Sequence, residues 1–162
     1  MKNSPVETTS VQYASPPLSR IFAAMVYDGL LLAAVSIAYG ALVVGIHVLI
    51  NGQPEAGQRI QWGLTLGILI SIGWLFTLAF FFIYFWHKFG QTLGMKTWRL
   101  QMIDSQTLQL ADFKKCCIRS AVASISLLFF GIGYWYRWFH PQQKMLHDVI
   151  SGTQIILLKK RA

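Results

Sequence analysis

Residues 18–50, LSRIFAAMVYDGLLLAAVSIAYGALVVGIHVLI, decide the fold of this chain. From Ile21 to Ile50 the only formally charged side chain is Asp28. About 20 apolar residues are enough to cross the hydrocarbon core of a bilayer, so this stretch predicts a membrane-spanning helix. A carboxylate at such a depth costs roughly 2.5 to 3.5 kcal/mol on insertion scales. Asp28 therefore needs a partner, a water-filled cavity or a proton.

The composition also indicates a membrane protein. The 162 residues are 54% hydrophobic and 12% charged, whereas soluble domains carry roughly 25% charged residues. A net charge of +8 would suggest nucleic-acid binding in a soluble protein. Here the basic residues flank the apolar blocks, which favours roles in membrane topology and in contact with anionic lipid. We therefore expect membrane lipids as partners, and no nucleic acid.

A second spanning helix is predicted from Ile60 to Trp86. Gly63, Gly67 and Ser71 recur at intervals of four and form one face of small residues. Such a face lets two helix backbones approach closely. We expect it to pack against the first helix within the chain. The alternative is a contact between chains, either in a homo-oligomer or with a partner membrane protein.

The polar interval 87–119 is rich in lysine and arginine, which favours a cytoplasmic position for it and for the N-terminus. The expected location is a bacterial cytoplasmic (inner) membrane. Within the interval, residues 97–103 alternate loosely between apolar and polar side chains, which predicts a short strand. Residues 154–158 are its natural partner strand. Asp112 is expected to cap a basic amphipathic helix that runs to Arg119 along the membrane surface.

The third apolar segment, residues 121–139, is barely long enough to span, and Gly131 and Gly133 interrupt it. Basic residues flank both of its ends, which a simple crossing does not explain. One interpretation is a re-entrant hairpin that turns at the two glycines. The alternative is a third crossing with the C-terminus outside. The hairpin is favoured because the two predicted strands can pair only if they lie on one side of the membrane.

The predicted fold class is therefore an all-α transmembrane bundle. It has two full spanning helices, a third short or re-entrant apolar segment and a small cytoplasmic two-strand element. Residues 1–17 are expected to form a disordered cytoplasmic tail, 18–158 the membrane domain, and 159–162 a basic C-terminal tail.

Four motifs resemble those of the RDD family of small membrane proteins, which is named for one arginine and two aspartates. Residues 18–20 (LSR) and 27–29 (YDG) match the family's first arginine and aspartate. Residues 89–96 (FGQTLGMK) resemble its glycine-rich segment, and 146–153 (LHDVISGT) resemble its closing aspartate motif. The resemblance covers about residues 18–158. It implies a small multipass membrane protein, with cation–proton exchange proposed for some members and accessory roles for others.

Arg20 and Asp28 are too far apart to pair on one straight helix, because eight residues give about 12 Å of rise and some 80° of rotation. Arg20 is expected to pair with Asp148 or with lipid phosphate. Asp28 needs a different partner. The candidates are Arg119, a histidine, or a hydroxyl such as that of Thr65, Ser71 or Thr77.

Two functions from different classes follow from these residues. In the first, Asp28 exchanges a proton for a cation, and Thr65, Ser71 and Thr77 supply further oxygen ligands, because hard cations need several. In the second, Asp28 fixes the packing of a non-catalytic accessory or scaffold protein. His147 and Asp148 have no nucleophile with an oriented base nearby and are expected at a helix start or on the surface. We expect no enzymatic activity, cofactor or metal site, since the histidines show no ligand spacing.

Overall fold

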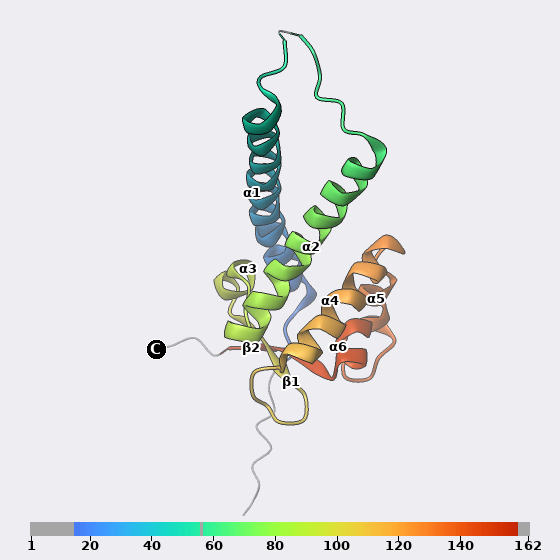
Figure 1. Ribbon diagram of the computed structural model, residues 1–162. Helices are drawn as coiled ribbons and strands as arrows, with labels where there is room; N and C mark the ends of the chain where they lie inside the picture. The colour runs from blue at the N-terminus through green and yellow to red at the C-terminus, as the bar shows by residue number, and fades with distance from the viewer. Residues whose placement is uncertain (1–14, 56, 159–162) are drawn as a thin grey trace, which may run out of the picture.

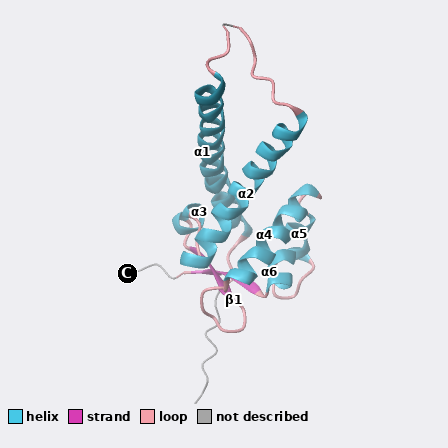
Figure 2. Cartoon of the chain, viewed as in Figure 1, coloured by secondary structure: helices cyan, strands magenta, loops and turns pink. Residues whose placement is uncertain are grey.

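The computed structural model describes residues 15–55 and 57–158. The predicted basic tail, 159–162, and most of the predicted disordered tail, 1–14, lie outside the described residues. Figure 1 shows two long helices that rise from a smaller lobe, and Figure 2 shows that the lobe holds a pair of strands among its helices. The long helices are α1 (Leu18–Asn51) and α2 (Leu64–Phe89).

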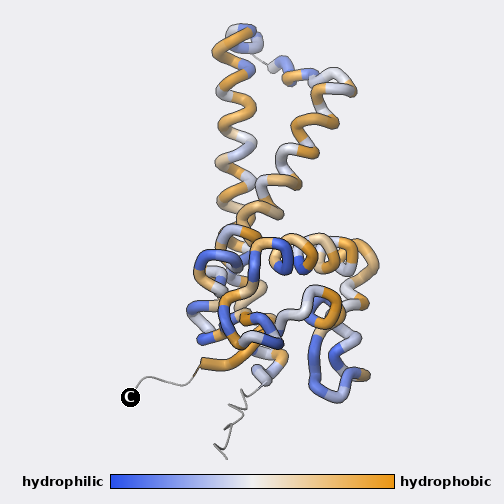
Figure 3. The backbone as a smooth tube through the Cα atoms, turned by 60° about the horizontal axis from the view of Figure 1, so that its bottom comes forward, coloured by the Kyte–Doolittle hydropathy of each residue, from blue (hydrophilic) through white to orange (hydrophobic). Residues whose placement is uncertain are grey.

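The predicted spanning helices are confirmed. Among the described residues, α1 and α2 are the helices long and apolar enough to cross a membrane. A third span would arise only if the bent pair formed by residues 113–128 and 132–138 counted as one span. Hydropathy follows this division, since the long helices are mainly apolar and the lobe mixes polar with apolar residues (Figure 3). Helix α2 begins later than predicted, at Leu64.

The two long helices diverge away from the lobe (Figure 1). We call residues 32–51 of α1 and 64–80 of α2 the arms. They meet near Gly73, where an added Cβ would lie 2.6 Å from the hydroxyl oxygen of Tyr39. That hydroxyl donates a hydrogen bond to the carbonyl of Ile70 at 2.8 Å. The indole N–H of Trp74 donates to the Ser36 hydroxyl at 2.9 Å.

The small-residue face was predicted to pack against the first helix, and the structure corrects this. A Cβ at Gly63 would meet no described atom within 4 Å, and one at Gly67 would meet only Trp62, at 3.9 Å. Ser71 is exposed. The reason is the divergence of the arms, which brings the helix backbones together at Gly73 and separates them toward Gly63.

The lobe comprises residues 15–31 and 81–158, which include the beginning of α1 and the end of α2. Its secondary structure consists of α3 (Leu93–Thr97), β1 (Leu100–Asp104), α4 (Phe113–Leu128), α5 (Ile132–Trp135), the 3-10 helix η1 (Tyr136–Trp138), α6 (Leu146–Ser151) and β2 (Thr153–Leu157). Its core is a cluster of buried apolar residues from both long helices and from the lobe: Ile21, Ala24, Trp86, Met95, Leu100, Met102, Ala111, Cys116 and Met145.

The predicted pair of strands is confirmed. Strands β1 and β2 are antiparallel, with Leu100 opposite Leu157 and Asp104 opposite Thr153. The first strand begins three residues later than predicted, because residues 93–97 form helix α3. The Thr92 side chain caps that helix by accepting a hydrogen bond from the Met95 N–H at 3.2 Å.

The third apolar segment is bent at the predicted glycines. The axis turns by 107° between α4 and the helices that follow it. Gly131 lies at the break with φ of 70°, a backbone conformation that favours glycine. Since β1 precedes this segment and β2 follows it, their pairing favours the re-entrant alternative over a third crossing.

The predicted surface helix from Asp112 to Arg119 differs from the structure. It is the first half of α4, a single helix that continues into the apolar segment as far as Leu128. Asp112 occupies the N-cap position, but its side chain makes no capping hydrogen bond.

Candidate functional site

Asp28 is buried in the lobe, with 5% of its surface exposed, and is held by residues at the start of α3. The Thr92 hydroxyl donates a hydrogen bond to its Oδ2 atom at 2.5 Å. The Gly94 N–H donates to its Oδ1 atom at 2.9 Å. The prediction that a hydroxyl could be the partner of Asp28 is confirmed, but the hydroxyl belongs to Thr92 and not to the residues named as examples, Thr65, Ser71 and Thr77. A backbone amide is the second partner, and the alternatives of Arg119 or a histidine were wrong.

Gly94 allows this contact because it lies directly against α1. A Cβ at this position would overlap the carbonyl oxygen of Ala24 and would lie 2.8 Å from Asp28 Oδ1. The second glycine of the segment at 89–96 is therefore a packing contact for the first helix, whereas Gly90 lies against Leu110 and Met102. Thr92, which caps α3, uses the same hydroxyl to bond Asp28, so one side chain joins both helices.

Arg119 and Asp148 form a buried ion pair that joins α4 to α6. The Nη1 atom of Arg119 donates to Asp148 Oδ1 and also to the Thr153 hydroxyl, the latter at 2.9 Å. Each side chain of the pair is at most 4% exposed. The predicted pair between Arg20 and Asp148 is therefore corrected. The C-terminal motif is clamped to α4 and not to α1, because α6 packs beside α4.

Arg137 is a buried arginine that the sequence analysis missed. Its Nη2 atom donates to the Pro16 carbonyl at 2.6 Å and to the Ser15 hydroxyl at 3.0 Å. It lies in η1, and 5% of its surface is exposed. The described end of the predicted disordered tail, residues 15–17, is thus attached to the lobe.

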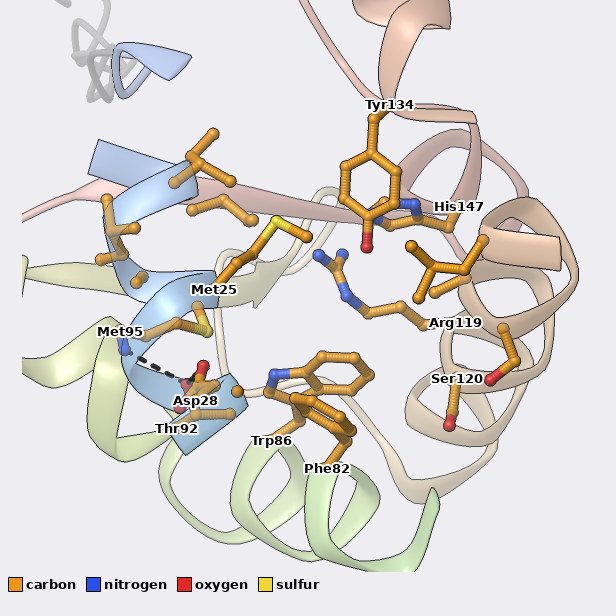
Figure 4. Close-up of a pocket in the computed structure, with 18 of the residues that line it drawn as sticks. Met25, Asp28, Phe82, Trp86, Thr92, Met95, Arg119, Ser120, Tyr134 and His147 are labelled. Carbon is orange, nitrogen blue, oxygen red and sulfur yellow. Dashed lines mark hydrogen bonds between the residues drawn. The ribbon is translucent and has the colours of Figure 1, made fainter. Parts of the chain in front are cut away.

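The lobe holds a pocket of about 220 Å³ between these contacts (Figure 4). Asp28 and Met25 of α1 line one side, and Phe82 and Trp86 of α2 line another. The remaining wall comes from the lobe: from α4, α5 and α6, with Arg119, Ser120, Tyr134 and His147 among their residues, and from α3, β1 and β2. For comparison, a dry cavity of about 150 Å³ can hold benzene, so this space is large enough for a small ligand group.

Three buried nitrogen atoms of residues that line this pocket have no hydrogen-bond partner among the described residues. They are Nε1 of Trp86, Nε of Arg119 and Nδ1 of His147. The guanidinium carbon of Arg119 lies 4.9 Å from the centre of the Trp86 ring, so these two side chains also stack. An unpaired buried polar group costs about 1–3 kcal/mol, and proteins therefore leave few of them. The pocket concentrates such groups.

His147 was expected at a helix start or on the surface. It lies in the first turn of α6, but it is buried, with 2% of its surface exposed. Burial, with a contribution from the Arg119 charge, lowers the pKa of His147 to about 4. The imidazole is consequently neutral at physiological pH. Its ring packs against Tyr134 with a centroid distance of 5.0 Å.

Thr65, Ser71 and Thr77 do not join this site. None of them lines the pocket. The Ser71 hydroxyl donates to the Gly67 carbonyl at 2.9 Å, and the Thr77 hydroxyl donates to the Gly73 carbonyl at 2.8 Å. These bonds lie within α2, where hydroxyls commonly bond the carbonyl four residues before them. Within the described part of the chain, no group of three or more His, Cys, Asp or Glu side chains could hold a metal ion.

The fold and the site define a helical membrane protein with two long apolar helices, a bent apolar pair and a lobe held together by buried polar contacts. The chain belongs to the RDD family, whose model matches residues 14–152. A similar protein is the uncharacterized protein RP437 of Rickettsia prowazekii (strain Madrid E), at 33% identity over 89 residues. That match covers 55% of this chain and about half, 49%, of the relative. No solved structure matches the chain significantly.

Proposed function

We propose that this protein is a non-catalytic binding protein of the bacterial inner membrane and that the pocket is its ligand site. The observation that carries this proposal is the gathering of unpartnered buried nitrogen atoms around a cavity of about 220 Å³. A largely apolar cavity with a few convergent polar groups is the usual form of a small-molecule site. In this account Asp28 and the Arg119–Asp148 pair hold the walls of the pocket in place, which is an accessory role and not an ion-transporting one.

The polar groups of the pocket also favour binding over cation exchange. The charge of Arg119 is already paired with Asp148, and a guanidinium supplies no oxygen ligand for a cation. The three hydroxyls predicted as cation ligands lie elsewhere. Asp28 uses both carboxylate oxygens in hydrogen bonds to Thr92 and Gly94. The Asp28 carboxylate therefore already has partners in its own chain.

Binding can be tested with oleate as the probe. The protein, purified in a nonionic detergent, is titrated with oleate while its unfolding temperature is measured. We expect a saturable rise, because a ligand that binds only the folded state stabilises it. Ser124→Phe places bulk at an exposed lining residue and should reduce the rise. The matched control is Ile125→Phe, at an exposed neighbour that does not line the pocket. An unsaturable response, or equal effects of the two variants, contradicts the proposal.

Cation–proton exchange is the second candidate, favoured by one observation. Asp28 lines the pocket beside the Thr92 hydroxyl. In proteoliposomes with sodium, potassium or lithium gradients, our first proposal predicts no cation-dependent proton flux. Flux that is lost in Asp28→Asn and kept in Asp104→Asn would support exchange instead. Asp104 is a suitable control because it lies in β1 and does not line the pocket.

The orientation is a further part of the proposal. The basic residues of the interval 87–119 favour a cytoplasmic lobe and a cytoplasmic N-terminus. Cysteine introduced at Ala162 should then be protected from an impermeant thiol reagent in intact cells. Cysteine introduced at Glu55, in the loop between the arms, should react. The opposite pattern of reactivity would show that the lobe lies outside the cell. Reaction at both sites indicates a third crossing.

A further inference from the structure

We propose that the ligand of the pocket is an acyl-chain lipid with an anionic oxygen head, such as a carboxylate or a phosphate. This inference rests on the proposed function and names its ligand class. It depends on the buried residues around Trp86 and Arg119, which we call the closed end of the pocket, and on the exposed lining residues, where the pocket opens.

The closed end offers hydrogen-bond donors. Arg119 uses Nη1 for Asp148 and Thr153, which leaves its Nε–H without a described partner. The indole N–H of Trp86 is also without one, and the two side chains stack. Both are at least nine-tenths buried, with 3% and 8% of their surfaces exposed. Figure 4 shows both side chains reaching into the open space, with the Tyr134 hydroxyl directed toward the guanidinium.

Because the N–H groups of Trp86 and Arg119 have no described acceptor, we expect the ligand to supply a hydrogen-bond acceptor. An ionised oxygen is the strongest such acceptor, because charge-assisted hydrogen bonds are roughly twice as strong as neutral ones. Asp28 is the carboxylate that lines the pocket, and its oxygens already accept bonds from Thr92 and Gly94. It lies across the pocket from Arg119 (Figure 4), so the head of the ligand belongs at the Arg119 end.

The opening of the pocket points to a lipid. Its exposed lining residues are Gly29 of α1, and Ser124 and Leu127 of α4. Leu127 lies eight residues beyond Arg119, about 12 Å along the helix. Just past it, the side chains of Leu128 and Phe130 are 81% and 96% exposed. Exposed apolar residues in a membrane protein face acyl chains, so a ligand whose head binds Arg119 can extend its chain into the bilayer between α1 and α4.

The test compares four probes that differ in the head or in the chain. Oleate and oleoyl lysophosphatidate carry an anionic head on the chain, and oleyl alcohol carries a neutral head. Inorganic phosphate has no chain. Affinity is measured from the saturable rise in unfolding temperature of the detergent-purified protein, and native mass spectrometry gives the stoichiometry. We expect both anionic lipids to bind at least tenfold more tightly than oleyl alcohol, and inorganic phosphate to cause no saturable rise.

The decisive variant is Trp86→Phe, which removes one N–H donor and keeps an aromatic ring beside Arg119. Trp86 is also a buried core residue, so the smaller ring should lower the unfolding temperature without ligand, and the ligand-induced rise of each variant is measured from its own ligand-free value. The affinity of Trp86→Phe for both anionic lipids should fall about tenfold, as expected for one hydrogen bond to a charged group. The matched control is Trp98→Phe. The Trp98 Nε1 atom is also buried without a described partner, but it does not line the pocket.

The outcomes separate this inference from the proposed function. If oleyl alcohol binds as tightly as oleate, the proposed requirement for an anionic head is wrong, although the pocket is still a ligand site. If inorganic phosphate binds as tightly as the lipids, the proposed requirement for an acyl chain is wrong. Unchanged affinity in both Trp86→Phe and Ser124→Phe overturns the placement of the ligand. If no probe binds saturably, the proposed function itself fails.

Discussion

The lobe and the arms use their polar groups in different ways. In the lobe, buried polar side chains join segments that are far apart in sequence, as in the bonds from Thr92 to Asp28 and from Arg119 to Asp148. In the arms, the hydroxyls of Ser71 and Thr77 bond carbonyls of their own helix, and the hydrogen bonds that cross between the arms gather near Gly73. The chain itself therefore fixes the lobe, whereas the faces of the arms are left for lipid or for another helix. This contrast predicts where substitutions matter most.

The largest effect is expected at the Arg119–Asp148 pair. Arg119→Met leaves the buried Asp148 charge without its partner, and breaking such a pair costs about 3–5 kcal/mol. The double variant Arg119→Met/Asp148→Leu removes both charges and should recover most of that loss. The measurement is the free energy of unfolding in detergent micelles.

A matched comparison is the pair of Lys115 and Asp104, whose Nζ and Oδ2 atoms lie 2.5 Å apart. The Lys115 side chain is 30% exposed, so Lys115→Met should cost at most about 1 kcal/mol. Equal losses at Lys115 and Arg119 would contradict the contrast between buried and exposed contacts in the lobe.

The second effect is a pH dependence caused by His147. Its folded-state pKa of about 4 lies below the unfolded value of about 6.5. The unfolded chain therefore binds more protons between these values, and stability falls as the pH falls from about 6.5 to 4. The expected loss is about 3 kcal/mol. His147→Phe should flatten this part of the stability profile, whereas His87→Phe, at an exposed residue of α2, should leave it unchanged.

A smaller effect is expected in the arms. Tyr39→Phe removes the hydrogen bond to the Ile70 carbonyl, and such interhelical bonds in membranes average about 0.6 kcal/mol. Tyr27→Phe, at an exposed tyrosine of the same helix, serves as the control. A loss above about 2 kcal/mol in Tyr39→Phe would show that the arms are also fixed by contacts within the chain.

The sequence predicted the elements with strong local signals. Length and hydropathy were enough for α1 and α2, because about 20 apolar residues already set the minimum span. The bent segment followed from Gly131 and Gly133. The strand pair followed from the loose alternation at 97–103 and from 154–158 as its natural partner strand. The start of the first strand was displaced by α3, whose five residues are too few to show helical periodicity.

The partners in the site could not be predicted in the same way. Thr92 lies 64 residues after Asp28, in a short turn. Its position just before α3 and the nearby Gly94 are the local features of the sequence that mark this turn, and neither identifies Asp28 as the partner. Arg20 and Arg119 carry the same charge, so sequence alone cannot rank them as partners of Asp148. The choice depends on the packing of α4 against α6. The pocket could not be predicted for the same reason, since its lining combines residues of both long helices with residues from helices and strands throughout the lobe.

The most direct test of the account is a double-mutant cycle between Asp28 and Thr92. Asp28→Ala, Thr92→Val and the double variant are compared by their free energies of unfolding in micelles. If the Thr92 hydroxyl holds the Asp28 carboxylate and so joins α1 to α3, the two losses should be non-additive, with a coupling energy of about 1–2 kcal/mol. Additive losses, within about 0.3 kcal/mol, would show that the carboxylate has another partner and would contradict the account.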